Sequence, residues 1–185
     1  RVTTVRGNVM SNKFEILMNQ LDMPLEMRNS EAFLNAEIEK VLVHKVSRVW
    51  EFHFSFANIL PIEIFRELQK RLAQEFSKTG NQAVFEIHCQ APQVSDELLQ
   101  VYYQLVFEEG PCASHGFKSL YQDLRVHLDG DKLLIEGAST IDTEHFRKNH
   151  LPNLSQQLVK YGFPQLTCQV QHSDELTQQQ AENFQ

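Results

Sequence analysis

The chain has 185 residues, 42% of them hydrophobic, which allows one domain or two small ones with ordinary cores. Its net charge of -7 lies wholly in the second half, because residues 1–90 carry 11 basic and 11 acidic side chains and residues 91–185 carry 6 and 13. Sequence-independent affinity for nucleic acid comes mainly from Lys and Arg, so this distribution argues against autonomous DNA or RNA binding by the second half.

Residues 1–10 show no hydrophobic pattern, and we expect them to form a disordered extension that precedes the fold. A short helix is expected from Asn12, which would cap it, because four apolar residues follow at helical spacing. These residues are Phe14, Leu17, Met18 and Leu21. A further short helix is expected near Ser30–Leu34.

The segment Trp50–Phe56 alternates four aromatic residues with Glu51, His53 and Ser55. Such alternation is typical of a strand with one buried face and one wet face. The segment 38–46 is rich in β-branched residues, and we expect it to pair with this strand in a hairpin.

An amphipathic helix is expected over 62–76, directly after Pro61, which suits the first turn of a helix. Its apolar stripe should cover the aromatic face of the hairpin. A third strand is expected over 84–89, with Glu86 and His88 outward. These elements predict a first domain over residues 11–90.

A domain boundary is expected at Ala91–Pro92, because Pro cannot donate to a sheet and a new helix opens directly afterwards. That helix is expected over 96–109, and a short second one around residues 117–124. A tight hairpin turn is expected at Asp129-Gly130-Asp131, where Gly tolerates a positive φ. We then expect a helix over 142–161 that is interrupted at Pro152.

A last strand is expected over 166–171, which completes a second domain over residues 91–172. Residues 173–185 are rich in Gln and Glu, and we expect a solvated linker to whatever follows. Both halves read helix, hairpin, helix, strand. The sequence therefore predicts an α+β protein of two small two-layer α/β sandwiches, each a three-stranded, mainly antiparallel sheet with helices on one face.

The sequence contains no GxGxxG or GxxxxGK[ST] loop for nucleotides, and no GxxG loop of the kind with which KH domains clamp nucleic-acid backbones. A metal site could be drawn at His145 and His150, or among acidic residues at the second hairpin, but helix and turn chemistry explain both groups better. The acidic residues are Asp123, Asp129, Asp131 and Glu136.

Cys112 and His115 are close in sequence, but catalytic pairs of this kind usually meet in space and not in one loop. We therefore expect no catalytic, cofactor-binding or metal site in this segment. The three cysteines contain no CxxC motif and no apolar run approaches the roughly 20 residues of a membrane span, which favours a cytoplasmic protein.

The polar face of the first sheet is the candidate binding surface, because histidines and carboxylates gather there. The residues that we expect to contact a protein partner are Glu51, His53, Ser55, Glu86 and His88. His44 is expected near the same face. The aromatic stripe opposite could stack bases, but the helix pattern that follows it favours core packing.

Several spaced segments carry a resemblance to a known family. These are Phe14-Glu15-Ile16-Leu17, the segment from His44 to Phe54, Leu60-Pro61-Ile62-Glu63-Ile64-Phe65, Glu109-Gly110-Pro111, Asn149-His150-Leu151-Pro152-Asn153 and Gly162-Phe163-Pro164. Together they resemble the N-terminal region of PolC, the DNA polymerase III alpha chain of low-GC Gram-positive bacteria, in its streptococcal forms. The resemblance covers about residues 10 to 180.

The resemblance implies two N-terminal domains ahead of the catalytic parts of a replicative polymerase. The first domain is similar to the alpha-binding domain V of the clamp-loader tau subunit, a variant of the KH type. The parent enzyme is implied to be a DNA-directed DNA polymerase with 3′-5′ exonuclease activity. No catalytic residue of the family is carried over, because its catalytic groups belong to later domains.

Two functions remain open at this point. The first is a protein-interaction module that docks a replisome partner, such as clamp-loader tau, the clamp, primase or a helicase-loading factor, or another part of the polymerase. The alternative is an accessory module that binds single-stranded nucleic acid through the charge-balanced first domain. Otherwise DNA is expected to be bound by the rest of the polymerase.

Overall fold

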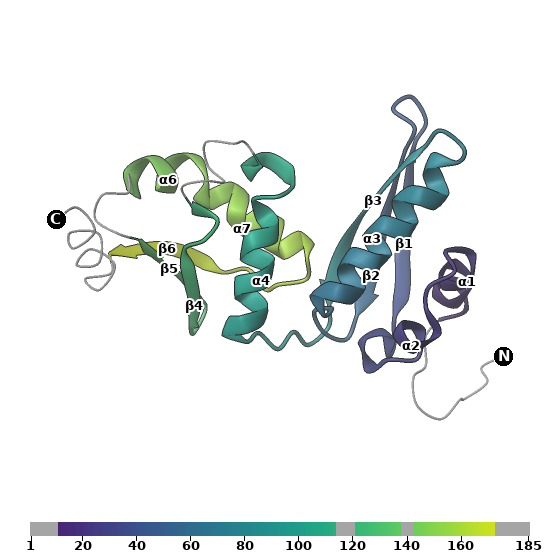
Figure 1. Ribbon diagram of the computed structural model, residues 1–185, viewed down its shortest axis with the longest axis horizontal. Coiled ribbons are helices and arrows are strands. Elements are labelled where there is room, and N and C mark those ends of the chain that lie inside the picture. Colours follow the sequence, from purple (N-terminus) through teal and green to yellow (C-terminus); the bar gives the residue numbers. More distant parts are fainter. Residues whose placement is uncertain (1–10, 114–120, 138–142, 173–185) are drawn as a thin grey trace. The chain divides into compact units, whose positions relative to one another are not determined.

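The computed structural model describes residues 11–113, 121–137 and 143–172. The chain divides into two compact units, residues 1–93 with 160–163, and residues 94–159 with 164–185. Each unit contains one three-stranded sheet (Figure 1).

Over residues 11–93, the first unit contains three helices, one short 3-10 turn and three strands. In chain order they are α1 (Asn12–Gln20), α2 (Leu25–Arg28), η1 (Glu31–Phe33), β1 (Glu37–His44), β2 (Val49–Phe56), α3 (Ile62–Ser77) and β3 (Gln82–Cys89). The strand order is β1-β2-β3, with β1 antiparallel and β3 parallel to β2. Both α1 and α3 pack on the aromatic side of this sheet through Phe14 and Phe76.

The core of the first unit consists of interlocking aromatic rings. Phe14 of α1 contacts Phe33, Phe54 and Phe56 with ring centroids 5.1 to 5.7 Å apart. From the last turn of α3, Phe76 meets Phe52. Offset and edge-on aromatic pairs of this kind add to the free energy gained by burial, so the alternating pattern of β2 fixes which face receives the helices.

The start of α1 differs by one residue from the expectation. Its N-cap is Ser11, whose side-chain oxygen accepts a 3.3 Å hydrogen bond from the Phe14 amide, and Asn12 is the first helical residue. A hydroxyl two to three residues before a free amide is well suited to that role. Pro24 opens the four-residue α2, which the sequence did not reveal.

The second unit repeats the same plan. Among the described residues its elements are α4 (Asp96–Val106), η2 (Gly110–Cys112), β4 (Arg125–Asp129), β5 (Lys132–Gly137), α6 (Thr143–Asn149), α7 (Leu151–Lys160, whose last residue already belongs to the first unit) and β6 (Thr167–His172). The sheet order is β4-β5-β6, with an antiparallel hairpin followed by a parallel strand. Gly130 turns the hairpin at φ +64°, as expected for a tight turn.

Side chains of α4 hold the hairpin of the second unit in register. Gln100 donates from Nε2 to the Leu124 carbonyl and accepts at Oε1 from the Val126 amide, at 3.0 and 2.8 Å. Asp96 Oδ1 accepts from the Leu128 amide at 2.9 Å. These contacts satisfy backbone groups at the edge of β4, which would otherwise lack a strand partner.

The predicted fold class, two three-stranded sheets each accompanied by helices, is confirmed. Each sheet is mixed, however, and not mainly antiparallel. A helical crossover returns the chain in the same direction, so the third strand pairs in parallel. The helix expected over 142–161 is two helices, with Pro152 in the first turn of α7. The one expected around residues 117–124 lies mostly outside the described residues. The likeness to KH domains stays a prediction.

Candidate functional site

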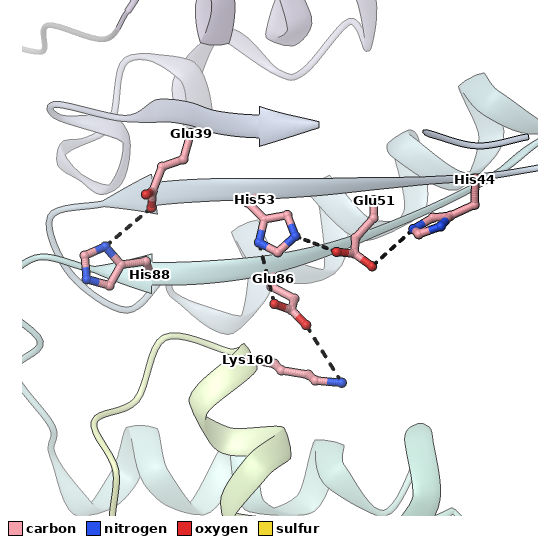
Figure 2. A network of polar contacts seen from close by, with 7 residues as sticks. All are labelled: Glu39, His44, Glu51, His53, Glu86, His88 and Lys160. Atoms are coloured by element: carbon pink, nitrogen blue, oxygen red, sulfur yellow. Dashed lines mark hydrogen bonds and ion pairs between the residues drawn. The ribbon is translucent and has the colours of Figure 1, made fainter. Parts of the chain in front are cut away.

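The candidate site is the outer face of the first sheet, the face opposite Phe52 and Phe54. Side chains alternate along a strand, so Glu51 and His53 of β2 project from it. In the register of β2 and β3, His53 lies beside Glu86. Figure 2 shows these three side chains turned toward one another.

His53 lies between two carboxylates. Its Nε2 is 2.5 Å from Glu51 Oε2, and its Nδ1 is 3.6 Å from Glu86 Oε2. On the other side, Glu51 Oε1 is 3.7 Å from Nε2 of His44, at the end of β1. Two strands and the end of a third therefore contribute to one polar network (Figure 2).

The network lowers the pKa of Glu51 below its ordinary value. The hydrogen bond from His53 is the largest cause, partial burial opposes it, and electrostatic attraction to the rings of His53 and His44 adds to it. The fold therefore favours the carboxylate form of Glu51, which accepts from the His53 ring.

Ser55 does not belong to the exposed surface, which corrects the expectation. Its side chain is buried, at 5% exposure, and its Oγ accepts a 3.2 Å hydrogen bond from Gln90 Nε2. Gln90 follows β3, and its amide also bonds to the Phe56 carbonyl. Gln90 therefore donates to the Ser55 hydroxyl, which the alternation of β2 had predicted to face solvent.

His88 lies on the outer face but outside the network around His53. Its Nδ1 is 3.4 Å from Oε1 of Glu39, which lies at the irregularity in β1 between Ile38 and Lys40. Both side chains are well exposed. Glu86 in turn lies 3.9 Å from Lys160 Nζ, which belongs to the same unit.

Exposed apolar side chains flank the network, and the alternation along each strand does not by itself reveal them. In the register of the sheet, Leu42 and Val84 are the two neighbours of Glu51, and they are 39% and 45% exposed. The outer face thus combines two aliphatic side chains with an ordered set of charges. The register of the three strands, once known, is the signal that identifies them.

The residues that were considered as catalytic or metal-binding candidates have structural surroundings where the structure describes them. Cys112 is buried and burial raises its pKa, while His115 lies outside the described residues. His150 is buried beside the rings of Tyr121 and Phe146, and the side chain of His145 is not described.

The acidic hairpin of the second unit shows ordinary strand contacts. Glu136 Oε1 lies 3.6 Å from His127 Nδ1, and Asp129 pairs with Lys132 beside the turn. Within residues 11–113, 121–137 and 143–172, no group of three or more His, Cys, Asp or Glu side chains could hold a metal ion. No helix in those ranges is long and apolar enough to cross a bilayer.

The fold thus defines a protein with two small α/β units, each a mixed three-stranded sheet with helices. Comparison with known protein families identifies the family of this chain. The family model described as DNA polymerase III polC-type N-terminus I matches residues 13–87, and the one described as N-terminus II matches residues 101–185. The chain belongs to the N-terminal region of PolC-type DNA polymerase III.

Curated relatives agree with this family. The chain is 98% identical over 176 residues to the PolC-type DNA polymerase III of Streptococcus sanguinis. Over 175 residues it is 63% identical to that of Streptococcus pneumoniae and 46% identical to that of Streptococcus pyogenes. Each match covers 95% of this chain but only 12% of the relative. No solved structure matches the chain significantly.

Proposed function

We propose that this segment is a non-catalytic protein-interaction module of a replicative DNA polymerase, acting in DNA replication in the cytoplasm. The relatives that it matches are named as PolC-type DNA polymerase III, which supports replication as the process. Polymerase activity, 3′-5′ exonuclease activity and the main contacts with DNA are assigned to the rest of that polymerase.

The observation that carries the proposal is the composition of the outer face. Leu42 and Val84 expose aliphatic surface on either side of a carboxylate that is already held in place by His53 and His44. A partner that covers the two aliphatic side chains gains apolar burial, and it meets a Glu51–His53 pair that is already hydrogen-bonded in the free protein.

The partner is a replisome protein or another part of the polymerase. The candidates are clamp-loader tau, the clamp, primase and helicase-loading factors. Glu51, His53, Glu86 and His88 form the polar part of the proposed contact, and Leu42 and Val84 form its apolar part.

The test is biolayer interferometry of the 185-residue chain against each of these purified proteins. The double variant Leu42→Glu with Val84→Glu should weaken binding to the true partner at least about tenfold. The matched control is Ile16→Glu with Leu25→Glu, which changes two exposed apolar residues on helices, away from the outer face. The control should bind as the unchanged chain does.

Two results would contradict the proposal. One is the absence of measurable binding to any of these purified proteins, combined with normal replication by a polymerase that lacks residues 10–172. The other is tight, salt-dependent binding of a labelled single-stranded oligonucleotide that the outer-face variant abolishes, which would favour the nucleic-acid alternative.

A further inference from the structure

The aromatic face of the first sheet extends past the helix that covers it. Val43, Trp50 and Ala83 form one row across the three strands, on the same face as Phe52. Trp50 packs against Phe76, close to the end of α3. In Figure 1 the loop between β1 and β2 projects past that end of α3.

An open hollow of about 490 Å³ lies at this uncovered end. Val43, Val46 and Trp50 give it an apolar lining, and Asn81, after α3, forms part of the opposite wall. Val43 is 45% exposed and Val46 is completely exposed. We call this feature the hairpin hollow.

Arg48 fixes the two walls of the hairpin hollow. It has a positive φ of 59° in the β1–β2 turn, and its guanidinium donates a 2.8 Å hydrogen bond to the Thr79 carbonyl. The Arg48 carbonyl in turn accepts from the Gln82 amide at 2.9 Å. These bonds join the hairpin to the α3–β3 turn, so a ligand would enter a site whose walls are already placed.

The charge of the hairpin hollow is positive. Among the described residues that line it, Lys45 and Arg48 are cationic and no carboxylate is present. His44 is the third basic residue of the lining, and its Nε2 lies 3.7 Å from Glu51 Oε1 on the outer face. A ligand that complements this lining carries carboxylates next to an apolar group.

An extended peptide meets these demands better than a nucleic acid does. Val43 and Val46 offer aliphatic surface, whereas single strands need flat aromatic platforms, and Trp50 is half-buried against Phe76. In addition, β1 is an edge strand, and among the described residues only β2 pairs with it. A peptide strand could therefore align with β1, where backbone groups are available for pairing.

We propose that the hairpin hollow docks an extended acidic segment of a partner protein. An apolar side chain of the segment enters between Val43, Val46 and Trp50, and flanking carboxylates pair with Lys45 and Arg48. This inference rests on the proposed interaction role, but it uses a different surface from the outer face. Either surface can therefore fail its test alone.

The experiment measures fluorescence anisotropy of labelled probes with the 185-residue chain. The main probe is an octapeptide of alternating glutamate and leucine. The comparison probes are octapeptides of alternating lysine and leucine and of alternating glutamate and serine, and an oligothymidylate. The glutamate–leucine peptide should bind with a Kd below about 1 mM, and at least about tenfold more tightly than the other three.

Lys45→Glu and Val46→Asp should each weaken that binding at least about tenfold, because both residues are exposed and neither supports the core. The controls are Lys13→Glu and Ile16→Asp, which make the same kinds of change on α1 and should bind normally. No binding at 1 mM, binding that the two hollow variants leave unchanged, preferred binding of oligothymidylate, or self-association that Val46→Asp abolishes would each overturn the proposal.

Discussion

His53 Nε2 and Glu51 Oε2 lie 2.5 Å apart on the outer face of the first sheet, two residues apart on the same strand. Alternation along β2 places both side chains on one face, but their further contacts depend on which residues of β1 and β3 lie beside them. His44 at the end of β1 and Glu86 on β3 extend the pair into a network. The outer face is therefore an ordered surface whose charge depends on its histidines and carboxylates.

Glu51→Gln should lower the free energy of unfolding by about 0.5 kcal/mol at about pH 6, as measured by urea unfolding. The fold lowers the pKa of Glu51, so its contribution is present above the pKa of the unfolded chain, ordinarily 4.5. That contribution is lost as the pH falls through the lower folded pKa, so the difference between the variant and the unchanged chain should shrink steadily as the pH is lowered below 4.5. Glu26→Gln, at an exposed position, is the control for the substitution itself and should leave the free energy of unfolding unchanged at about pH 6. A loss for Glu51→Gln that does not shrink with falling pH would contradict the assignment.

Arg71→Ala should lower the free energy of unfolding by about 1 to 2 kcal/mol. Arg71 donates to Glu67 one turn earlier in α3, and it also donates to the carbonyls of Leu21 and Asp22 at the end of α1. Its hydrogen bond is the largest cause of the lowered pKa of Glu67.

Urea unfolding, followed by the fluorescence of the single Trp50, reports on the first unit and measures this loss. Arg71→Lys should recover only part of it, because an ammonium cannot span the same acceptors. Lys70→Ala, which removes an exposed ammonium 3.5 Å from Glu67, should cost less than about 0.5 kcal/mol. Equal effects of Arg71→Ala and Lys70→Ala would show that the contacts with α1 contribute nothing.

Phe14→Ala should lower the free energy of unfolding of the first unit by about 3 to 4 kcal/mol. The ring is fully buried and contacts Phe33, Phe54 and Phe56, so its removal leaves a cavity where α1 meets the sheet. Ile16→Ala, on the exposed side of the same helix, should change the value by less than about 0.5 kcal/mol. A similar small effect at Phe14 would mean that α1 is not part of the cooperative core.

The three thiols should react slowly with Ellman's reagent at about pH 8 in the native protein and rapidly in urea. Burial raises the pKa of Cys89 to about 11, that of Cys168 to about 12, and that of Cys112 as well. Because unfolding restores an ordinary thiol near 9.0, stability should also fall as the pH rises above that value. Fast labelling of the native protein, at the rate of free glutathione, would contradict this prediction.

The alternation of Trp50–Phe56, the apolar stripe of α3 and the Asp129-Gly130 turn allowed the hairpins and their covering helix to be predicted. Local periodicity determines which face of a strand is buried. Strand direction depends instead on the path of the connection between two strands. The parallel pairing of β3 with β2, and of β6 with β5, was missed for that reason. The short α2 was missed because four residues carry too little pattern.

The candidate site was predicted in part. Alternation identified Glu51, His53 and Glu86 on one face, and the structure brings these three side chains together. Ser55 was misplaced because the alternation of β2 reveals neither its burial nor its hydrogen bond from Gln90, which lies beyond the strand. Whether this face binds a protein stays a prediction.

The parallel third strand has a consequence for how the protein is made. On the ribosome, β1 and β2 emerge first, and β2 can pair with β3 only after the whole of α3 has been synthesised. For that interval the nascent hairpin displays Trp50 and Phe52 without Phe76 of α3, which packs on both rings in the folded unit. In the second unit, β5 likewise lacks its parallel partner until β6 is made. Chaperone binding during translation should concentrate in these two windows, because exposed apolar surface and open strand edges are what such factors protect.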